Sequence, residues 1–363
     1  MQIVICGLSI TSSWGNGHAS TYRGLIRELV SRGNDVLFLE RDVPWYAANR
    51  DMPQPPFGRT KLYSSLDELR DLYTPVIREA DLVIVGSYVP QGVGVGNWVL
   101  ENASNLTAFY DIDTPVTLAK LRRNDAEYIS PDQIPRYGMY LSFTGGPTLH
   151  RLENKHGARC ARALYCCVDP EEYRPVHLKP MYQLGYLGTY SPDRQPALEE
   201  LLLQPAWRWQ KGTFAVAGSQ YPVSMHWPPN VLHIEHVPAA RHAQFYAQQQ
   251  FTLNITRQDM RQAGYCPSVR LFEAAACGTP IISDNWEGLG LFFEIGKEII
   301  LASSAEEVLG VLQTTTAAGR LDIAARARLR VLREHTAAHR AEQLEKYAIE
   351  AMDNLHARRQ LAS

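Results

Sequence analysis

A pair of acids at the end of an apolar run is the first set of residues that could do chemistry. Asp111 and Asp113 follow the run 106–110 directly and precede Thr114-Pro115. The pair could supply a general base, because the carboxyl ends of parallel strands form the binding crevice of α/β sheets. It could also cap a helix that has Pro at its first position, or bind a divalent metal. The sequence favours the base and the cap over the metal site.

His18 is the second candidate for proton chemistry. It follows the glycine-rich segment 15–17 and stands near the start of a helix, where the dipole favours a neutral imidazole that can act as a base or donor. A histidine that only caps or packs is the alternative. The segment matches G-x-G-x-x-G except at Ser20, and Glu40 ends the next strand, as in a dinucleotide site. The loop is too long for a tight dinucleotide turn, so we expect it to bring His18 into a cleft.

The stretch 264–283, GYCPSVRLFEAAACGTPIIS, predicts a helix followed by a buried strand. Ser268 is expected to cap a helix that begins at Val269 and ends at the Cys277-Gly278 pair. Arg270 is the only base of this helix and Glu273 its only acid. The N–H groups at its start could hold an anion such as a diphosphate. The alternative is an ordinary packing helix with an i,i+3 ion pair between these two side chains.

The string from Ser268 to Ser283 resembles the nucleotide-sugar signature of GT-B glycosyltransferases, in particular the group 1 and spore-maturation-type (CgeB-like) proteins. The resemblance implies that Glu273 holds the ribose hydroxyls of a donor nucleotide and that the start of the helix faces its diphosphate. Many retaining relatives have a second Glu eight positions upstream, where this chain has Tyr265. The resemblance therefore does not imply retaining chemistry.

Further candidates lie at other strand ends of the second half. Arg194 lies shortly after the run 182–187, and Arg257 follows the run 251–255 directly. A base beside a glycine turn suits a diphosphate, although an exposed surface arginine is the alternative for Arg194. The residues expected at the donor are Gly188, Thr189, Arg194, Gly218, Arg257, Ser268, Val269, Arg270 and Glu273. Those expected on the acceptor side are His18, Asp111 and Asp113, with Gly15, Asn16 and Gly17 in the neighbouring loop.

Apolar runs alternate with helical patterns along both halves, which predicts an α/β protein with parallel sheets. The length of 363 residues suggests two domains. We expect two Rossmann-like domains of the GT-B type, at 1–172 and 181–335, facing a central cleft. The segment 336–363 should form a helix that crosses back to the first domain. The predicted elements include a strand at 162–167 and helices at 195–203 and 238–249.

The composition is that of a globular protein, with 45% hydrophobic and 20% charged residues. A formal net charge of −2 gives no electrostatic reason to expect nucleic acid or an anionic membrane as partner. No apolar run approaches the ~18 residues of a membrane span, and the start does not resemble a signal peptide, so we expect a cytoplasmic protein. Six cysteines without C-x-x-C spacing predict reduced thiols rather than a zinc site.

These features together favour a metal-independent hexosyltransferase. It would move a sugar from a nucleoside-diphosphate sugar, with UDP favoured, to the hydroxyl of a glycan, a small molecule or a protein. No cofactor or metal is expected, because arginines and a helix N-terminus would stabilise the diphosphate. One alternative is a sugar-nucleotide epimerase of the same fold. Another is a non-catalytic glycan-binding or assembly protein that kept the fold.

Overall fold

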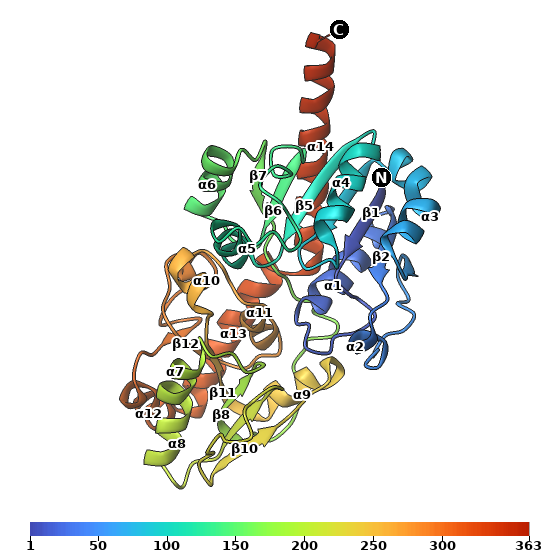
Figure 1. Ribbon diagram of the computed structural model, residues 1–363. Coiled ribbons are helices and arrows are strands. Elements are labelled where there is room, and N and C mark those ends of the chain that lie inside the picture. The colour runs from blue at the N-terminus through green and yellow to red at the C-terminus, as the bar shows by residue number, and fades with distance from the viewer. Residues whose placement is uncertain (363) are drawn as a thin grey trace. The chain divides into compact units, whose positions relative to one another are not determined.

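The computed structural model describes residues 1–362; residue 363 and the side chains at 356 and 358–362 lie outside the description. Contacts between residues divide the chain into two units. The first unit contains Met1–Cys167 together with the chain from Ala337 onward, and the second contains Val168–Thr336. Each unit is built on one parallel sheet (Figure 1).

The first unit has a sheet in the order β3-β2-β1-β4-β5-β6-β7, in which all pairs are parallel. The strands are β1 (Gln2–Gly7), β2 (Asp35–Arg41), β3 (Arg59–Tyr63), β4 (Leu82–Gly86), β5 (Leu106–Asp111), β6 (Met139–Ser142) and β7 (Ala161–Ala163). The helices are α1 (His18–Ser31), α2 (Pro44–Ala47), α3 (Leu66–Glu79), α4 (Gly92–Asn102), α5 (Thr114–Arg122), α6 (Pro147–His156) and α14 (Ala337–Ala362). β4 and β5 are buried along their whole length, as expected for central strands covered on both faces.

The last helix, α14, belongs to the first unit and packs against α1. Glu345 of α14 fixes this contact, because its carboxylate accepts hydrogen bonds from Arg32 Nε at 2.7 Å and Asn34 Nδ2 at 2.6 Å. Leu344 and Ala348, from the stripe of small and apolar residues on α14, are fully buried. The end of the chain therefore completes the first unit rather than the second.

The second unit has a parallel sheet in the order β10-β9-β8-β11-β12-β13. The strands are β8 (Tyr182–Leu187), β9 (Phe214–Ala217), β10 (Val231–Ile234), β11 (Gln249–Asn254), β12 (Ile281–Ser283) and β13 (Ile300–Leu301). The α-helices are α7 (Gln195–Leu198), α8 (Gln204–Arg208), α9 (His242–Ala247), α10 (Gln258–Ala263), α11 (Val269–Ala276), α12 (Ala305–Thr314) and α13 (Ala317–Glu334). A π-helix (Glu199–Leu203) and two 3-10 turns (Ala239–Arg241 and Leu289–Leu291) complete the unit. The predicted fold class, two Rossmann-like domains, is confirmed.

The direction of strand addition reverses once in each sheet, between β1 and β4 and between β8 and β11. In open α/β sheets, ligands bind outside the carboxyl ends of the strands at such a point. The loops that follow β1, β4, β8 and β11 are therefore where functional side chains should gather. Eight of the predicted candidate positions lie in or next to these loops: Gly15, Asn16, Gly17, His18, Gly188, Thr189, Arg194 and Arg257.

Three predicted elements differ from the structure. The strand predicted at 162–167 is shorter, since β7 ends at Ala163. The helix predicted at 238–249 begins as a 3-10 turn, and Gln249 already pairs with Tyr182 in the sheet. The helix expected to end at 203 continues through a π-helical turn into α8, because Pro205 has no N–H to bond to the carbonyl four residues earlier.

None of the helices in the described part of the chain is both long and apolar enough to cross a membrane. Across residues 1–362, no group of three or more His, Cys, Asp or Glu side chains has the arrangement of a metal site. The six cysteines are not joined in disulfides, and five of them are buried.

Candidate functional site

Two glycine turns touch each other at the carboxyl ends of β8 and β9. A Cβ atom on Gly218 would lie 2.0 Å from the Gly188 carbonyl oxygen, far inside van der Waals contact. Gly188 N donates to the Ala217 carbonyl at 2.8 Å, and the Tyr221 hydroxyl donates to the Gly188 carbonyl at 3.1 Å. Only glycine at position 218 allows this approach, so the turn that carries Thr189 depends on it.

Gly218→Ala should therefore lower the free energy of unfolding by about 1–3 kcal/mol, because the added methyl must displace backbone rather than a flexible side chain. Chemical denaturation measures this loss. Gly290→Ala is the matched control, since a Cβ there meets no atom within 4 Å. Equal stability of the two variants would contradict the close contact.

Arginine side chains gather beside these turns. The buried Arg270 donates from Nη1 to Asn254 Oδ1 at 3.0 Å and from Nε to the Leu187 carbonyl, and its guanidinium lies over the Tyr186 ring at 4.8 Å. Arg194 donates from Nη2 to the Thr189 carbonyl, while its buried Nε has no hydrogen-bond partner among the described residues.

Burial lowers the pKa of the Arg194 guanidinium. The like charges of Arg270 and Arg257 act in the same direction, whereas Tyr186 and Asp193 oppose it. Arg194 and Arg270 both donate to backbone carbonyls at the end of β8, and Arg257 precedes Gln258, whose backbone N donates to Asp193 of the same loop at 3.0 Å. Such an arrangement is stabilised by an anion, and a diphosphate offers several oxygens to planar guanidinium donors.

Ser268 is the N-cap residue of α11, as predicted, but its side chain makes no capping hydrogen bond. Its hydroxyl donates instead to Asn254 Oδ1 at 2.7 Å, the same oxygen that accepts from Arg270. Asn254 ends β11 and thereby fixes both side chains to the sheet. Because the Ser268 hydroxyl does not occupy the first-turn N–H groups, the helix start keeps its capacity to bind an anion.

Glu273 lies one turn further along α11 and is only 3% exposed. Its Oε2 accepts a hydrogen bond from the Tyr246 hydroxyl at 3.2 Å and lies 3.9 Å from His242 Nδ1. Burial, and then the Glu273 charge, raise the pKa of Tyr246 well above its usual range, so this phenol remains a donor. The i,i+3 pair suggested by the sequence does not form, because Arg270 turns to β8 and β11 instead.

Tyr265, at the position where retaining relatives have Glu, is held against the loop after β12. Its backbone N donates to the Glu287 carbonyl at 2.6 Å and its hydroxyl to Glu287 Oε1 at 3.2 Å. Its φ is 51°, and its ring fills the space that a Cβ on Gly288 would need. An acid thus stands next to this position, although it comes from a different loop.

In the first unit, His18 and Asp113 lie near each other. His18 is the first residue of α1, and its Nε2 is 3.9 Å from Asp113 Oδ2. Asp113 occupies the N-cap position of α5, yet its side chain makes no capping hydrogen bond. Its Oδ2 instead accepts from the Tyr88 hydroxyl at 2.8 Å. Tyr88, in the loop after β4, has no pattern around it in the sequence that would single it out.

Asp111 is completely buried. Its carboxylate accepts from the Tyr140 hydroxyl at 2.5 Å, the Thr117 hydroxyl at 2.8 Å and Asp113 N at 3.2 Å. Burial raises its pKa to about 6, and these hydrogen bonds limit the rise. Asp111 therefore supports the turn that presents Asp113.

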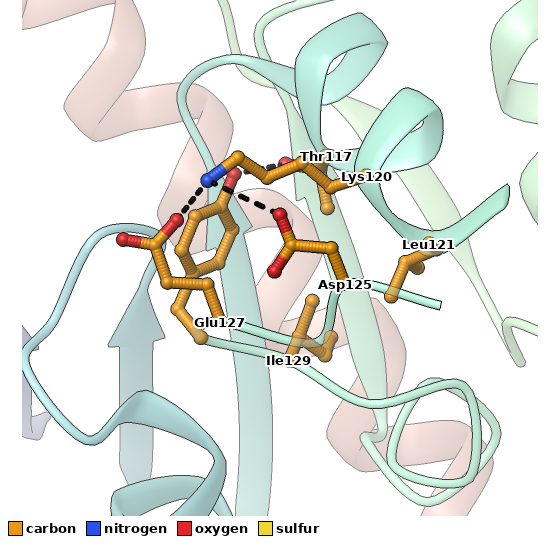
Figure 2. A pocket seen from close by; sticks show the side chains of 7 residues that line it. Thr117, Lys120, Leu121, Asp125, Glu127 and Ile129 are labelled. Atoms are coloured by element: carbon orange, nitrogen blue, oxygen red, sulfur yellow. Dashed lines mark hydrogen bonds and ion pairs between the residues drawn. The ribbon is translucent and has the colours of Figure 1, made fainter. Parts of the chain in front are cut away.

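A small pocket borders this network (Figure 2). Thr117 lines it and shares a 2.8 Å hydrogen bond with the Tyr128 hydroxyl. Lys120 points across the pocket and pairs with Asp125 and Glu127. Because both acids neutralise the charge of this lysine, the pocket is a poor binding site for an anion.

The loop of residues 15–17 is shaped by its own hydrogen bonds. Asn16 Nδ2 donates to the Ser9 carbonyl at 3.1 Å, and its Oδ1 accepts from His18 N at 3.2 Å, which places the start of α1. Glu40 is fully buried, and its two oxygens accept from the hydroxyls of Ser9 and Thr11 and from backbone N–H groups of the same loop. The acid that could have marked a dinucleotide site therefore holds the loop.

Nearly the whole chain matches solved structures, although the sequence identities are low. It matches sucrose-phosphate synthase (tll1590) from Thermosynechococcus elongatus with a TM-score of 0.68 and 15% identity, over 100% of both chains. It matches Anabaena Alr3699/HepE in complex with UDP and glucose with a TM-score of 0.71 and 13% identity, over 96% of this chain and 100% of that one. An alpha-glucosyltransferase in complex with UDP and a 13-mer DNA gives 0.70 and 11%, over 96% and 99%. These likenesses show a GT-B fold.

A second comparison concerns the amino-acid sequence. Residues 194–346 match the model of a family described as glycosyl transferase-like. Among proteins with curated descriptions, none matches the chain. The fold and the family match agree with each other and support a glycosyltransferase.

Proposed function

We propose that the protein moves a sugar from a UDP-sugar to an acceptor hydroxyl without a metal. The proposal rests on Arg194 and Arg270 at the end of β8 and on the start of α11, which together offer a diphosphate both cations and N–H donors. Glu273 on the same helix offers a carboxylate to ribose hydroxyls. UDP is favoured because the HepE and alpha-glucosyltransferase structures contain it.

The proposed reaction assigns donor binding and proton transfer to different residues. The acceptor oxygen bonds to the anomeric carbon of the sugar while the bond from that carbon to the β-phosphate oxygen breaks. Arg194, Arg257 and the start of α11 stabilise the charge that develops on the departing UDP. His18, oriented by Asp113, takes the proton of the acceptor hydroxyl.

A thermal-shift screen with UDP-, GDP-, ADP- and dTDP-sugars tests the donor. We expect UDP and UDP-sugars to stabilise the protein, by about 2.7 kcal/mol at a hundredfold excess over Kd. Transfer to hydroxyl acceptors should then continue in excess EDTA. Loss of transfer that Mn²⁺ restores would favour a metal at Asp111 and Asp113 instead.

The same assays separate the other candidate functions. An epimer formed from the donor alone would identify an epimerase, and glycan binding without turnover of any donor would identify a non-catalytic protein. The acceptor classes to test are glycans, small molecules and proteins.

The proposal also places the protein in the spore-maturation-type (CgeB-like) group, on the basis of the string from Ser268 to Ser283. A cytoplasmic location is part of the same proposal.

A further inference from the structure

The loop after β4 holds one tyrosine in an unusual backbone conformation. Tyr88 has a φ of 65°, a left-handed value that a bulky side chain rarely adopts. Ser87 Oγ ties the same loop to the turn after β5 by accepting from Ile112 N at 3.1 Å. The surrounding structure thus holds Tyr88 in an unfavourable backbone conformation. Such outliers cluster at functional sites.

The conformation brings the phenol of Tyr88 to the oxygen of Asp113 that faces His18. The hydroxyl lies 2.8 Å from Asp113 Oδ2, and His18 Nε2 lies 3.9 Å from the same atom. The ring of Tyr88 packs on that of Tyr128 with 4.8 Å between centroids, which fixes the phenol from the other side. Asp113 itself is 6% exposed, so its carboxylate depends on protein donors more than on water.

The titratable groups in contact with this oxygen include a phenol and an imidazole. His18 and Tyr88 face it directly, Asp111 lies behind it through a hydrogen bond to Asp113 N, and Lys120 reaches only the far ring of Tyr128, at 5.7 Å. Burial and then the Asp113 charge raise the pKa of Tyr88, so the phenol donates a proton and does not ionise. Asp113 therefore shares its charge between a phenol and an imidazole.

We propose that Tyr88 is a positioning residue for the acceptor-side pair of His18 and Asp113. It fixes Oδ2 in the direction of the imidazole. Its hydrogen bond also withdraws negative charge from the carboxylate, which weakens the attraction of Asp113 for a proton on the imidazole. The inference rests on the proposed transfer function and adds a residue to it.

The test measures the pH–rate profile of UDP-sugar transfer by Tyr88→Phe. We expect kcat to fall by about tenfold, the Kd for UDP to stay unchanged, and the acid limb of the profile to move to higher pH. Tyr63→Phe is the matched control, because its buried hydroxyl in the same unit has no hydrogen-bond partner among the described residues. That variant should keep the profile of the unchanged protein.

A second substitution should shift the acid limb in the opposite direction while nearly preserving the shape of the side chain. 3-Fluorotyrosine at position 88 makes the phenol a stronger donor, so the acid limb should move to lower pH. In an Asp113→Asn background, Tyr88→Phe should cost almost nothing further. If Tyr88 only ties two loops together, its variants lower stability and leave the profile in place, which overturns the inference. Absence of any transfer by the unchanged protein would instead refute the proposed function.

Discussion

A Glu273→Gln variant should bind UDP about 10- to 100-fold more weakly than the unchanged protein. Hydrogen bonds from ribose hydroxyls to a carboxylate are worth about 1.5–3 kcal/mol, and the amide would lose the charge that makes them strong. Glu273 is only 3% exposed, so water contributes little to replace the lost interaction. The amide keeps the shape of the side chain, and the Tyr246 hydroxyl at 3.2 Å can donate to its carbonyl oxygen as well.

Calorimetry with UDP and with a UDP-sugar measures the effect. Both ligands contain the ribose, so both affinities should fall by the same factor, and a loss confined to the UDP-sugar would place Glu273 at the sugar instead. Glu306→Gln is the control, because its side chain is 82% exposed and pairs only with Arg208. Unchanged UDP affinity in a folded Glu273→Gln protein would remove the ribose assignment.

The fold could be predicted because its signals are local. Buried parallel strands such as β4 and β5 are short continuous apolar runs, and the glycine-containing ends of α1 and α11 are visible in the sequence. Lengths of elements were less accurate where tertiary pairing decides them. Gln249 joins the sheet beside Tyr182, a partner that no local pattern could reveal.

The candidate site was predictable in its charged residues but not in the polar side chains that hold them. Asn254 connects Ser268 to Arg270, and Tyr88 connects the loop after β4 to Asp113. Each contact joins residues at least 14 positions apart, so the spacing of residues in the sequence does not predict it. The sequence pattern likewise gives no reason to assign Asp111 and Asp113 different roles. Their burial and hydrogen-bond partners in the structure distinguish them.

A His18→Ala variant should transfer sugar about 10²–10⁴-fold more slowly and still bind UDP, because a positioned base contributes that range of rate. Arg194, Arg270 and Glu273 belong to the second unit, whereas His18 belongs to the first. The substitution should therefore leave the Kd for UDP unchanged. Single-turnover transfer to a hydroxyl acceptor, beside calorimetry with UDP, separates the two effects.

His150→Ala provides the control for this variant, because His150 is an exposed histidine of α6 in the same unit. Asp113→Asn should follow His18→Ala in direction, since an amide orients the imidazole but cannot stabilise the imidazolium that forms when the proton arrives. Asp111→Asn should lower stability more than rate, because its carboxylate serves Tyr140, Thr117 and the backbone rather than a substrate. If His18→Ala keeps the full rate while Asp113→Asn loses it, the carboxylate of Asp113 is itself the base and His18 only lines the site.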